Sequence, residues 1–288
     1  MSGAPASSPA RSLAVWLALA VSSALLASLP ARAADATPPA WQIEAGVAAD
    51  RLSSAAPDWR QVDLALRHRY APRNLVEFNL RRTQRSGRAD TELGGVLALP
   101  LGAAWQASLG VTLSPSHEAL PRQSARLELS RSLAGGWVAS AALARRRFEV
   151  GNIDSGTSQL TVGLERYVDA WRFAAAFGST RLDGGGSAGN LRLQIDRSFA
   201  AERGRIGLIV ARGRELEGAP ATLLAPNDVV DQRVETLALV GILPLADRWA
   251  LTGEASHVRN GDLRRRSVLP AGAPYQRSGA RVGVRRDF

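Results

Sequence analysis

The chain has 288 residues, no cysteine and a formal net charge of +10, and every one of its basic residues is arginine. The lack of cysteine excludes disulfides and thiolate chemistry, and one methionine and three histidines leave little material for a metal site, so we expect no cofactor. Such a basic chain would suit a nucleic-acid-binding protein, but its arginines are scattered, without a basic helix or a recognisable nucleic-acid motif, and we expect no nucleic-acid partner.

The first 33 residues have the pattern of a cleaved secretory signal peptide. Arg11 supplies a positive start, residues 13–29 are almost wholly apolar or small, and Ala31-Arg32-Ala33 has the small-x-small form of a cleavage site. A permanent N-terminal membrane helix is the alternative, and the cleavage motif argues against it. Residues 34–40 would then be a short periplasmic lead-in to a single mature domain over 41–288.

The mature domain is a succession of short segments with alternating side chains. In 105–113 every odd position is apolar and every even position is small or polar, and a period of two puts each set on one face of a strand. The strand candidates are 41–52, 59–70, 75–84, 90–99, 104–114, 122–132, 137–147, 157–167, 171–182, 190–199, 205–216, 230–243, 249–259 and 277–288. We predict an all-β fold, an antiparallel up-and-down transmembrane β-barrel of about 14 strands, with 12 or 16 as alternatives, in the bacterial outer membrane.

The connections and the aromatic residues orient this barrel. Short turns alternate with longer loops, an arrangement that places the turns and both termini on the periplasmic side. Tryptophans open odd-numbered strands and other aromatic residues close even-numbered strands, and rings with one polar edge favour the headgroup level. The predicted periplasmic aromatic belt is Trp41, Tyr70, Trp105, Trp137, Tyr167, Trp171, Phe199, Trp249 and Phe288, and the candidates at the opposite rim are Trp59, Phe148 and Tyr275.

The last strand candidate is a predicted signal for the outer-membrane assembly machinery, because it alternates and ends in Phe288. Val282, Val284 and Arg286 share the face that would meet lipid, and Arg286 lies close enough to the rim to extend its charge into the headgroup region. We therefore expect membrane lipid, lipopolysaccharide and the assembly machinery as partners of a monomeric barrel.

Charged residues of both signs occupy the opposite, inward faces of the strands. The candidate lumen-facing residues are Asp63, Arg67, Arg69, Glu77, Arg81, Arg126, Glu128, Arg192, Asp196, Arg281 and Arg285. One interpretation is an arginine-lined conduit that selects anions. The other is a lumen cross-linked by arginine–carboxylate pairs that hold the wall together, which suits a barrel smaller than the sixteen-stranded porins.

His117 and Glu118 are candidate residues of an extracellular loop, within Ser114-Pro115-Ser116-His117-Glu118. A serine–histidine–acid constellation would make this a hydrolase, but adjacency in sequence does not supply the required geometry. We therefore favour a loop role and expect no catalytic residues.

Several short motifs resemble the YaiO family of outer-membrane β-barrels over essentially all of 41–288. They include Asp58-Trp59-Arg60, Leu99-Pro100-Leu101-Gly102, Leu120-Pro121-Arg122, Glu165-Arg166-Tyr167 and Arg281-Val282-Gly283-Val284-Arg285. The resemblance departs at Arg286-Asp287, where a more aromatic ending is expected, and in the longer loop 260–276. It implies a barrel without an established activity, whose neighbourhood with glycosyltransferases points to polysaccharide traffic.

Three functions remain open from the sequence. The first is a pore or export conduit for small anions or an acidic polysaccharide, based on the arginines of the inward faces. The second is a closed structural or surface barrel that acts through its extracellular loops. The third, least favoured, is a lipid or ester hydrolase that uses His117, and we expect the chain not to be an enzyme.

Overall fold

The computed structural model describes residues 40–53, 58–85, 87–118, 120–150, 153–183, 185–200, 203–218, 229–265 and 275–288. The predicted signal peptide and residues 34–39 of the lead-in lie outside this part of the chain. No helix among the described residues is long and apolar enough to cross a membrane.

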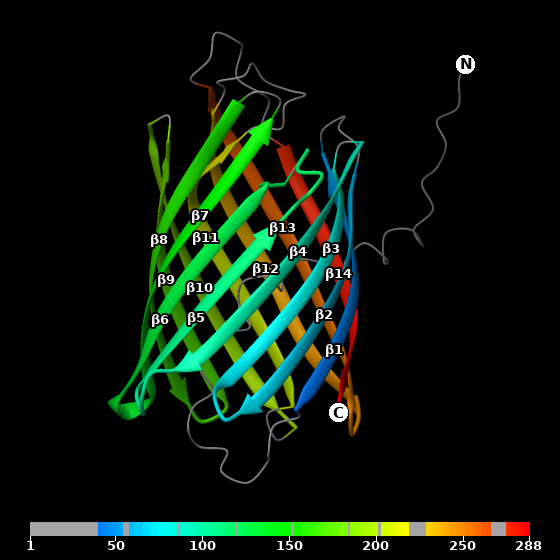
Figure 1. Cartoon of the computed structure of the whole chain (residues 1–288), viewed down its shortest axis with the longest axis vertical. Helices are drawn as coiled ribbons and strands as arrows, with labels where there is room; N and C mark the ends of the chain where they lie inside the picture. Colours follow the sequence, from blue (N-terminus) through cyan, green and yellow to red (C-terminus); the bar gives the residue numbers. More distant parts are fainter. Residues whose placement is uncertain are drawn as a thin grey trace, which may run out of the picture.

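The described residues form a closed barrel of fourteen antiparallel strands, which confirms the predicted fold (Figure 1). Each strand pairs with its neighbours in sequence, and β1 pairs with β14 to close the wall. The strands are β1 (Trp41–Leu52), β2 (Trp59–Ala71), β3 (Asn74–Arg85), β4 (Arg88–Pro100), β5 (Trp105–Leu113), β6 (Gln123–Leu133), β7 (Trp137–Val150), β8 (Ile153–Val168), β9 (Trp171–Leu182), β10 (Ser187–Phe199), β11 (Gly204–Gly218), β12 (Val229–Ala246), β13 (Trp249–Arg265) and β14 (Tyr275–Asp287). One turn of 3-10 helix, Ala134–Gly136, joins β6 to β7.

Strand boundaries differ from the predicted ones mainly at one end of the barrel. The predicted strand 249–259 extends to Arg265 in β13, because β12 and β13 continue to pair as far as Val230 and Arg265. This extension is polar and charged, so it lacks the apolar alternation from which the other strands could be read.

Alternation sorts the side chains between the outside and the inside of the barrel. In β1, Ile43 and Val47 are exposed on the outer surface, whereas Glu44 and Ala48 are buried on the inner one. Leucine, valine and phenylalanine repeat this outward pattern around the wall, and an exterior of this kind faces hydrocarbon rather than water.

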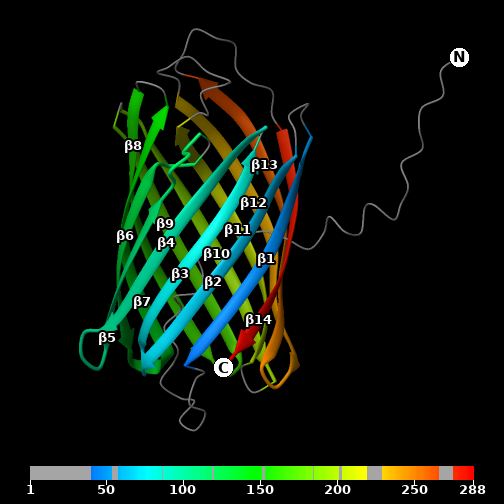
Figure 2. The ribbon, with the colours of Figure 1, turned by 45° about the vertical axis from the view of Figure 1, so that its right-hand side comes forward.

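Figure 2 shows the barrel with its two rims at opposite ends of the strands. β1 begins and β14 ends at one rim, which we call the terminal rim; the opposite one is the loop rim. The hairpins of the terminal rim are tight, and Arg73, Asp169 and Ala200 turn there with φ values of 68°, 50° and 51°. Arg73 also ties two turns together, since its guanidinium donates to the carbonyl oxygens of Gly102 (3.1 Å) and Ala103 (2.7 Å).

Candidate functional site

The lumen wall holds the predicted polar residues. The structure places the following side chains at inward strand positions: Asp63, Arg67 and Arg69 on β2; Glu77 and Arg81 on β3; Arg126 and Glu128 on β6; Arg192 and Asp196 on β10; and Arg281 and Arg285 on β14. What the sequence could not assign was the partner of each charge.

Five charged residues join four strands where the barrel closes, and we call them the closing cluster: Glu44, Asp63, Arg67, Glu77 and Arg281. The guanidinium of Arg67 donates to Glu77 at 2.6 Å and to Glu44 at 3.2 Å. Arg281 reaches back across the β1–β14 seam, with Nη1 at 2.9 Å from Glu44 and Nε donating to Asp63 at 3.0 Å. The cluster therefore links β3, β2, β1 and β14 through side chains as well as through the backbone ladder.

A second group lies on β8, β9 and β10, and we call it the sidewall cluster: Glu165, Tyr167, Arg172, Gln194 and Asp196. Arg172 donates to both carboxylate oxygens of Glu165 (2.7 and 3.0 Å) and to Asp196 at 2.7 Å. Gln194 Nε2 donates to Asp196 Oδ1 at 2.9 Å. Arg172 has 11% of its side chain exposed and Asp196 1%, so the charges are neutralised away from bulk water.

Tyr167 belongs to the sidewall cluster, which corrects its assignment to the aromatic belt. Its hydroxyl donates to Glu165 at 2.7 Å. The preceding residue, Arg166, pairs across the strands with outward-facing Trp137, and successive residues of a strand point to opposite faces. Tyr167 therefore points into the lumen, although it stands at the predicted end of its strand.

The remaining aromatic residues of the predicted belt lie on the outer surface at the terminal rim. They are Trp41, Tyr70, Trp105, Trp137, Trp171, Phe199, Trp249 and Phe288, each with roughly two fifths of its surface exposed. Arg286 stays at this rim, with its guanidinium carbon 5.1 Å from the centre of the Trp249 ring and 4.7 Å from that of Phe288.

Three further ion pairs neutralise predicted lumen residues. Arg81 pairs with Glu92 of β4, and Arg126 donates to Glu128 of its own strand at 2.7 Å. Arg285 is 3.3 Å from Asp287. Most predicted lumen arginines therefore have a carboxylate within reach, and the lumen is not a ring of bare cations.

A few inward charges have no such partner among the described residues. No side-chain hydrogen bond or ion pair there involves Arg69 or Arg205, and the Arg192 guanidinium donates only to the Gln194 amide oxygen, at 2.9 Å. Glu254 of β13 is 1% exposed, and neither of its carboxylate oxygens has a hydrogen-bond partner in this part of the chain.

Sequence reasoning missed several of these residues: Glu44, Glu92, Glu165, Arg172, Arg205 and Glu254. All of them lie at alternate positions of predicted strands. If the alternation of outward and inward positions in 105–113 is applied to each predicted strand, these residues are assigned to the lumen.

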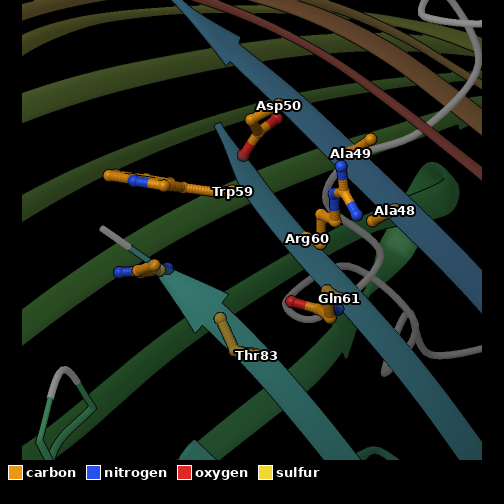
Figure 3. Close-up of a pocket in the computed structure, with 8 residues that line it drawn as sticks. Ala48, Ala49, Asp50, Trp59, Arg60, Gln61 and Thr83 are labelled. Carbon is orange, nitrogen blue, oxygen red and sulfur yellow. The ribbon is translucent and has the colours of Figure 1, made fainter. Parts of the chain in front are cut away.

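A small pocket lies near the loop rim between β1, β2 and β3 (Figure 3). Its volume of about 20 Å³ fits one water-sized group. Asp50 Oδ1, Trp59 Nε1 and Thr83 Oγ1 lie there buried and without a hydrogen-bond partner among the described residues. Trp59 thus faces the inside of the barrel, 4.5 Å from the guanidinium carbon of Arg85 and 5.0 Å from that of Arg277, and it does not mark a lipid interface as predicted.

His117 and Glu118 lie in the connection between β5 and β6, at the loop rim. The His117 Nδ1 atom is 3.2 Å from the Ser114 carbonyl oxygen and 3.1 Å from that of Pro115. The buried Ser114 hydroxyl has no hydrogen-bond partner among the described residues, so His117 contacts the Ser114 backbone and not its hydroxyl. Instead, Asp90 of β4 fixes this loop by accepting hydrogen bonds from the Glu118 and Leu120 amides, at 2.8 and 2.7 Å.

The described residues contain no group of three or more histidine, aspartate or glutamate side chains that could hold a metal ion. The described wall of the lumen carries fixed charges and hydrogen-bonding groups. Such a wall can guide or exclude a polar solute.

No model of a known protein family matches the sequence, and no curated protein does either. Solved structures of similar fold include the CymD monoaromatic hydrocarbon channel, with a TM-score of 0.58 at 7% identity over 88% of this chain and 89% of that one. A bacterial polysaccharide outer membrane secretin has a TM-score of 0.55 at 6% identity, over 88% of this chain and 100% of that one. An anion-selective porin from Comamonas acidovorans reaches 0.48 at 13% identity, over 86% and 98%.

The first two of these likenesses concern the fold, which is that of bacterial outer-membrane barrels. The apolar exterior agrees with this class. The chain is a fourteen-stranded β-barrel of the outer membrane.

Proposed function

We propose that the barrel is a conduit, and not an enzyme, that lets small polar solutes or a polysaccharide cross the outer membrane through its lumen. The observation that carries this proposal is the division of the wall between an apolar outer face and an inner face lined with charged and hydroxyl groups. A channel and a polysaccharide secretin have barrels of similar fold, which supports the same function.

Anion preference, on this proposal, comes from Arg69 and Arg205. Both stand near the terminal rim, at the end of β2 and the start of β11, and neither guanidinium forms a hydrogen bond or salt bridge with a carboxylate in the described part of the chain, although Arg205 lies within electrostatic range of Asp196 and Glu165. Arg281, which the sequence also suggested for this role, is held by Glu44 and Asp63. Cations that are not neutralised raise the local concentration of anions at a channel mouth.

Conductance in planar lipid bilayers under a salt gradient tests this proposal with the refolded mature protein. We expect stable current steps with anion preference, and a fall of about twofold in the anion-to-cation permeability ratio in Arg69→Gln/Arg205→Gln. The matched control is Arg131→Gln/Arg197→Gln, which removes two outward-facing charges near the same rim and should leave the ratio unchanged. Folded protein without conductance would contradict the conduit and favour a closed barrel.

In addition to small anions, we propose an acidic polysaccharide as a transported solute. A polysaccharide of this kind that blocks the current when it is added to the bilayer would be identified as a ligand of the lumen. The YaiO resemblance, a monomeric state and recognition of the Phe288 strand by the assembly machinery remain part of this proposal. The closing and sidewall clusters also support the closed-barrel alternative, because ion pairs between strands can hold the barrel wall together without any role in transport.

A further inference from the structure

The terminal rim repeats one arrangement around the barrel. Each tryptophan that opens β5, β7, β9 or β13 stands directly opposite an arginine of the next strand. The pairs are Trp105–Arg131, Trp137–Arg166, Trp171–Arg197 and Trp249–Arg286, with ring-to-guanidinium distances of 5.2, 5.2, 5.5 and 5.1 Å. In β1 the opposite residue is a histidine, and His68 stacks on Trp41 with ring centres 4.0 Å apart.

Backbone geometry explains why these side chains meet. At three of the four arginine pairs, the residue after the arginine donates its amide to the carbonyl of the residue before the tryptophan. These bonds run from Ser132 to Ala104, from Ser198 to Ala170 and from Asp287 to Arg248, each at 2.8 Å. The tryptophan and its arginine therefore occupy the neighbouring position without direct backbone bonds, where side chains of antiparallel strands lie closest.

These arginines differ from those of the lumen in having no counter-charge. Within the described ranges, no hydrogen bond or ion pair joins Arg131, Arg166, Arg197 or Arg286 to a carboxylate. Their strands present them on the outer surface beside half-exposed tryptophans, at the level where headgroups lie. A guanidinium that lies over a ring still has N–H donors in its plane, and these match phosphate oxygens.

We propose that the Trp–Arg pairs of the terminal rim bind the headgroup phosphates of anionic phospholipids in the leaflet that surrounds this rim. The ring holds the guanidinium in place, and the lipid supplies the charge that the chain lacks there. The binding is independent of whether the lumen conducts.

Tryptophan quenching in lipid vesicles tests this proposal with the folded mature protein. The vesicles contain phosphatidylcholine and phosphatidylglycerol, and in each series one of the two lipids carries brominated chains that quench tryptophan on contact. The emission reports on the terminal rim because, of the tryptophans after the signal peptide, only Trp59 lies elsewhere. We expect the association constant of phosphatidylglycerol to exceed that of phosphatidylcholine by about fivefold, and the ratio to fall as salt rises.

The decisive variant carries Arg131→Gln, Arg166→Gln, Arg197→Gln and Arg286→Gln. In this variant the ratio of the association constants of phosphatidylglycerol and phosphatidylcholine should fall to about one. The matched control removes the same charge from exposed outward positions nearer the loop rim, with Arg51→Gln, Arg60→Gln, Arg82→Gln and Arg259→Gln, and should keep the wild-type ratio. An unchanged ratio in the first variant, or an equal fall in both, would overturn the proposal. If the first variant does not fold, the wild type still decides, because equal quenching by the two lipids excludes a phosphate site selective for anionic lipid.

Discussion

Arg281 in the closing cluster and Arg197 at the terminal rim are the same residue type on two strands of one wall, β14 and β10, with opposite surroundings. Arg281 points inward, has 6% of its side chain exposed and lies between Glu44 and Asp63. Arg197 points outward over the Trp171 ring and meets no carboxylate among the described residues. At these two positions, strand parity separates an arginine that is neutralised by the protein from one that faces the membrane.

Removal of Arg281 should have the largest effect on stability. Arg281→Gln leaves Glu44 and Asp63 buried without their main cation, so we expect the free energy of unfolding to fall by about 3–5 kcal/mol. Urea titration of the protein in lipid vesicles, followed by tryptophan emission, measures this change. The control is Arg126→Gln, whose side chain is 43% exposed in its pair with Glu128 and whose loss should cost less than about 1 kcal/mol. Equal losses in the two variants would mean that burial does not separate these pairs.

Glu254 and Glu44 offer the next test, because Glu44 is ion-paired whereas neither oxygen of Glu254 accepts a hydrogen bond from the described residues. Glu44→Gln should lower the free energy of unfolding, since Arg67 and Arg281 both pair with Glu44. Glu254→Gln should raise it by about 1–2 kcal/mol, because burying an amide costs less than burying a carboxylate whose oxygens accept no hydrogen bond from the described residues. The same urea titration applies, and a loss of stability in Glu254→Gln would show that this carboxylate is compensated.

A smaller effect is expected at the terminal rim. Arg197→Gln removes a cation–ring contact at an exposed site, so the free energy of unfolding should fall by about 0.5–1 kcal/mol. A double-mutant cycle with Trp171→Phe separates this contact from the loss of either side chain alone. Additive losses in that cycle would mean that the ring and the guanidinium do not interact.

The smallest effect concerns Asp183, in the turn after β9. Hydrogen bonds from the Arg145 guanidinium hold the pKa of this exposed carboxyl below its usual value. The pair therefore contributes fully above the pKa of the unfolded chain, and this contribution is lost as the pH falls through the lower folded-state pKa. Titration of the carboxyl resonance by NMR should show a higher pKa in Arg145→Gln, and an unchanged pKa would contradict the pairing.

Much of the fold could be predicted from the sequence because alternation is a local property. A period of two in 105–113 determines both the strand and its two faces, and the same pattern recurs along residues 41–288. Partners could not be predicted, because the contact between Arg281 and Asp63 depends on a closure that brings together residues 218 positions apart.

The errors at Tyr167 and Trp59 have a common origin. Both residues were assigned from their position at a strand end. This position determines the level of the residue in the membrane, but not whether its side chain points to the lipid or to the lumen. The outward series Leu160, Val162 and Leu164 already placed position 167 on the inner face. At Trp59, Asp50 lies directly opposite on β1 and is buried on the inner wall.

The position of Arg281 on the last strand has a consequence for the order of assembly. Before β14 arrives, the segment from β1 to β3 holds Glu44, Asp63 and Glu77 against Arg67 alone within the closing cluster, an excess of negative charge. The final strand brings the missing cation to that edge at the moment when its backbone completes the hydrogen-bond ladder. Closure of the barrel therefore completes the neutralisation of the closing cluster as well as the backbone ladder, and Arg281 of β14 supplies that charge.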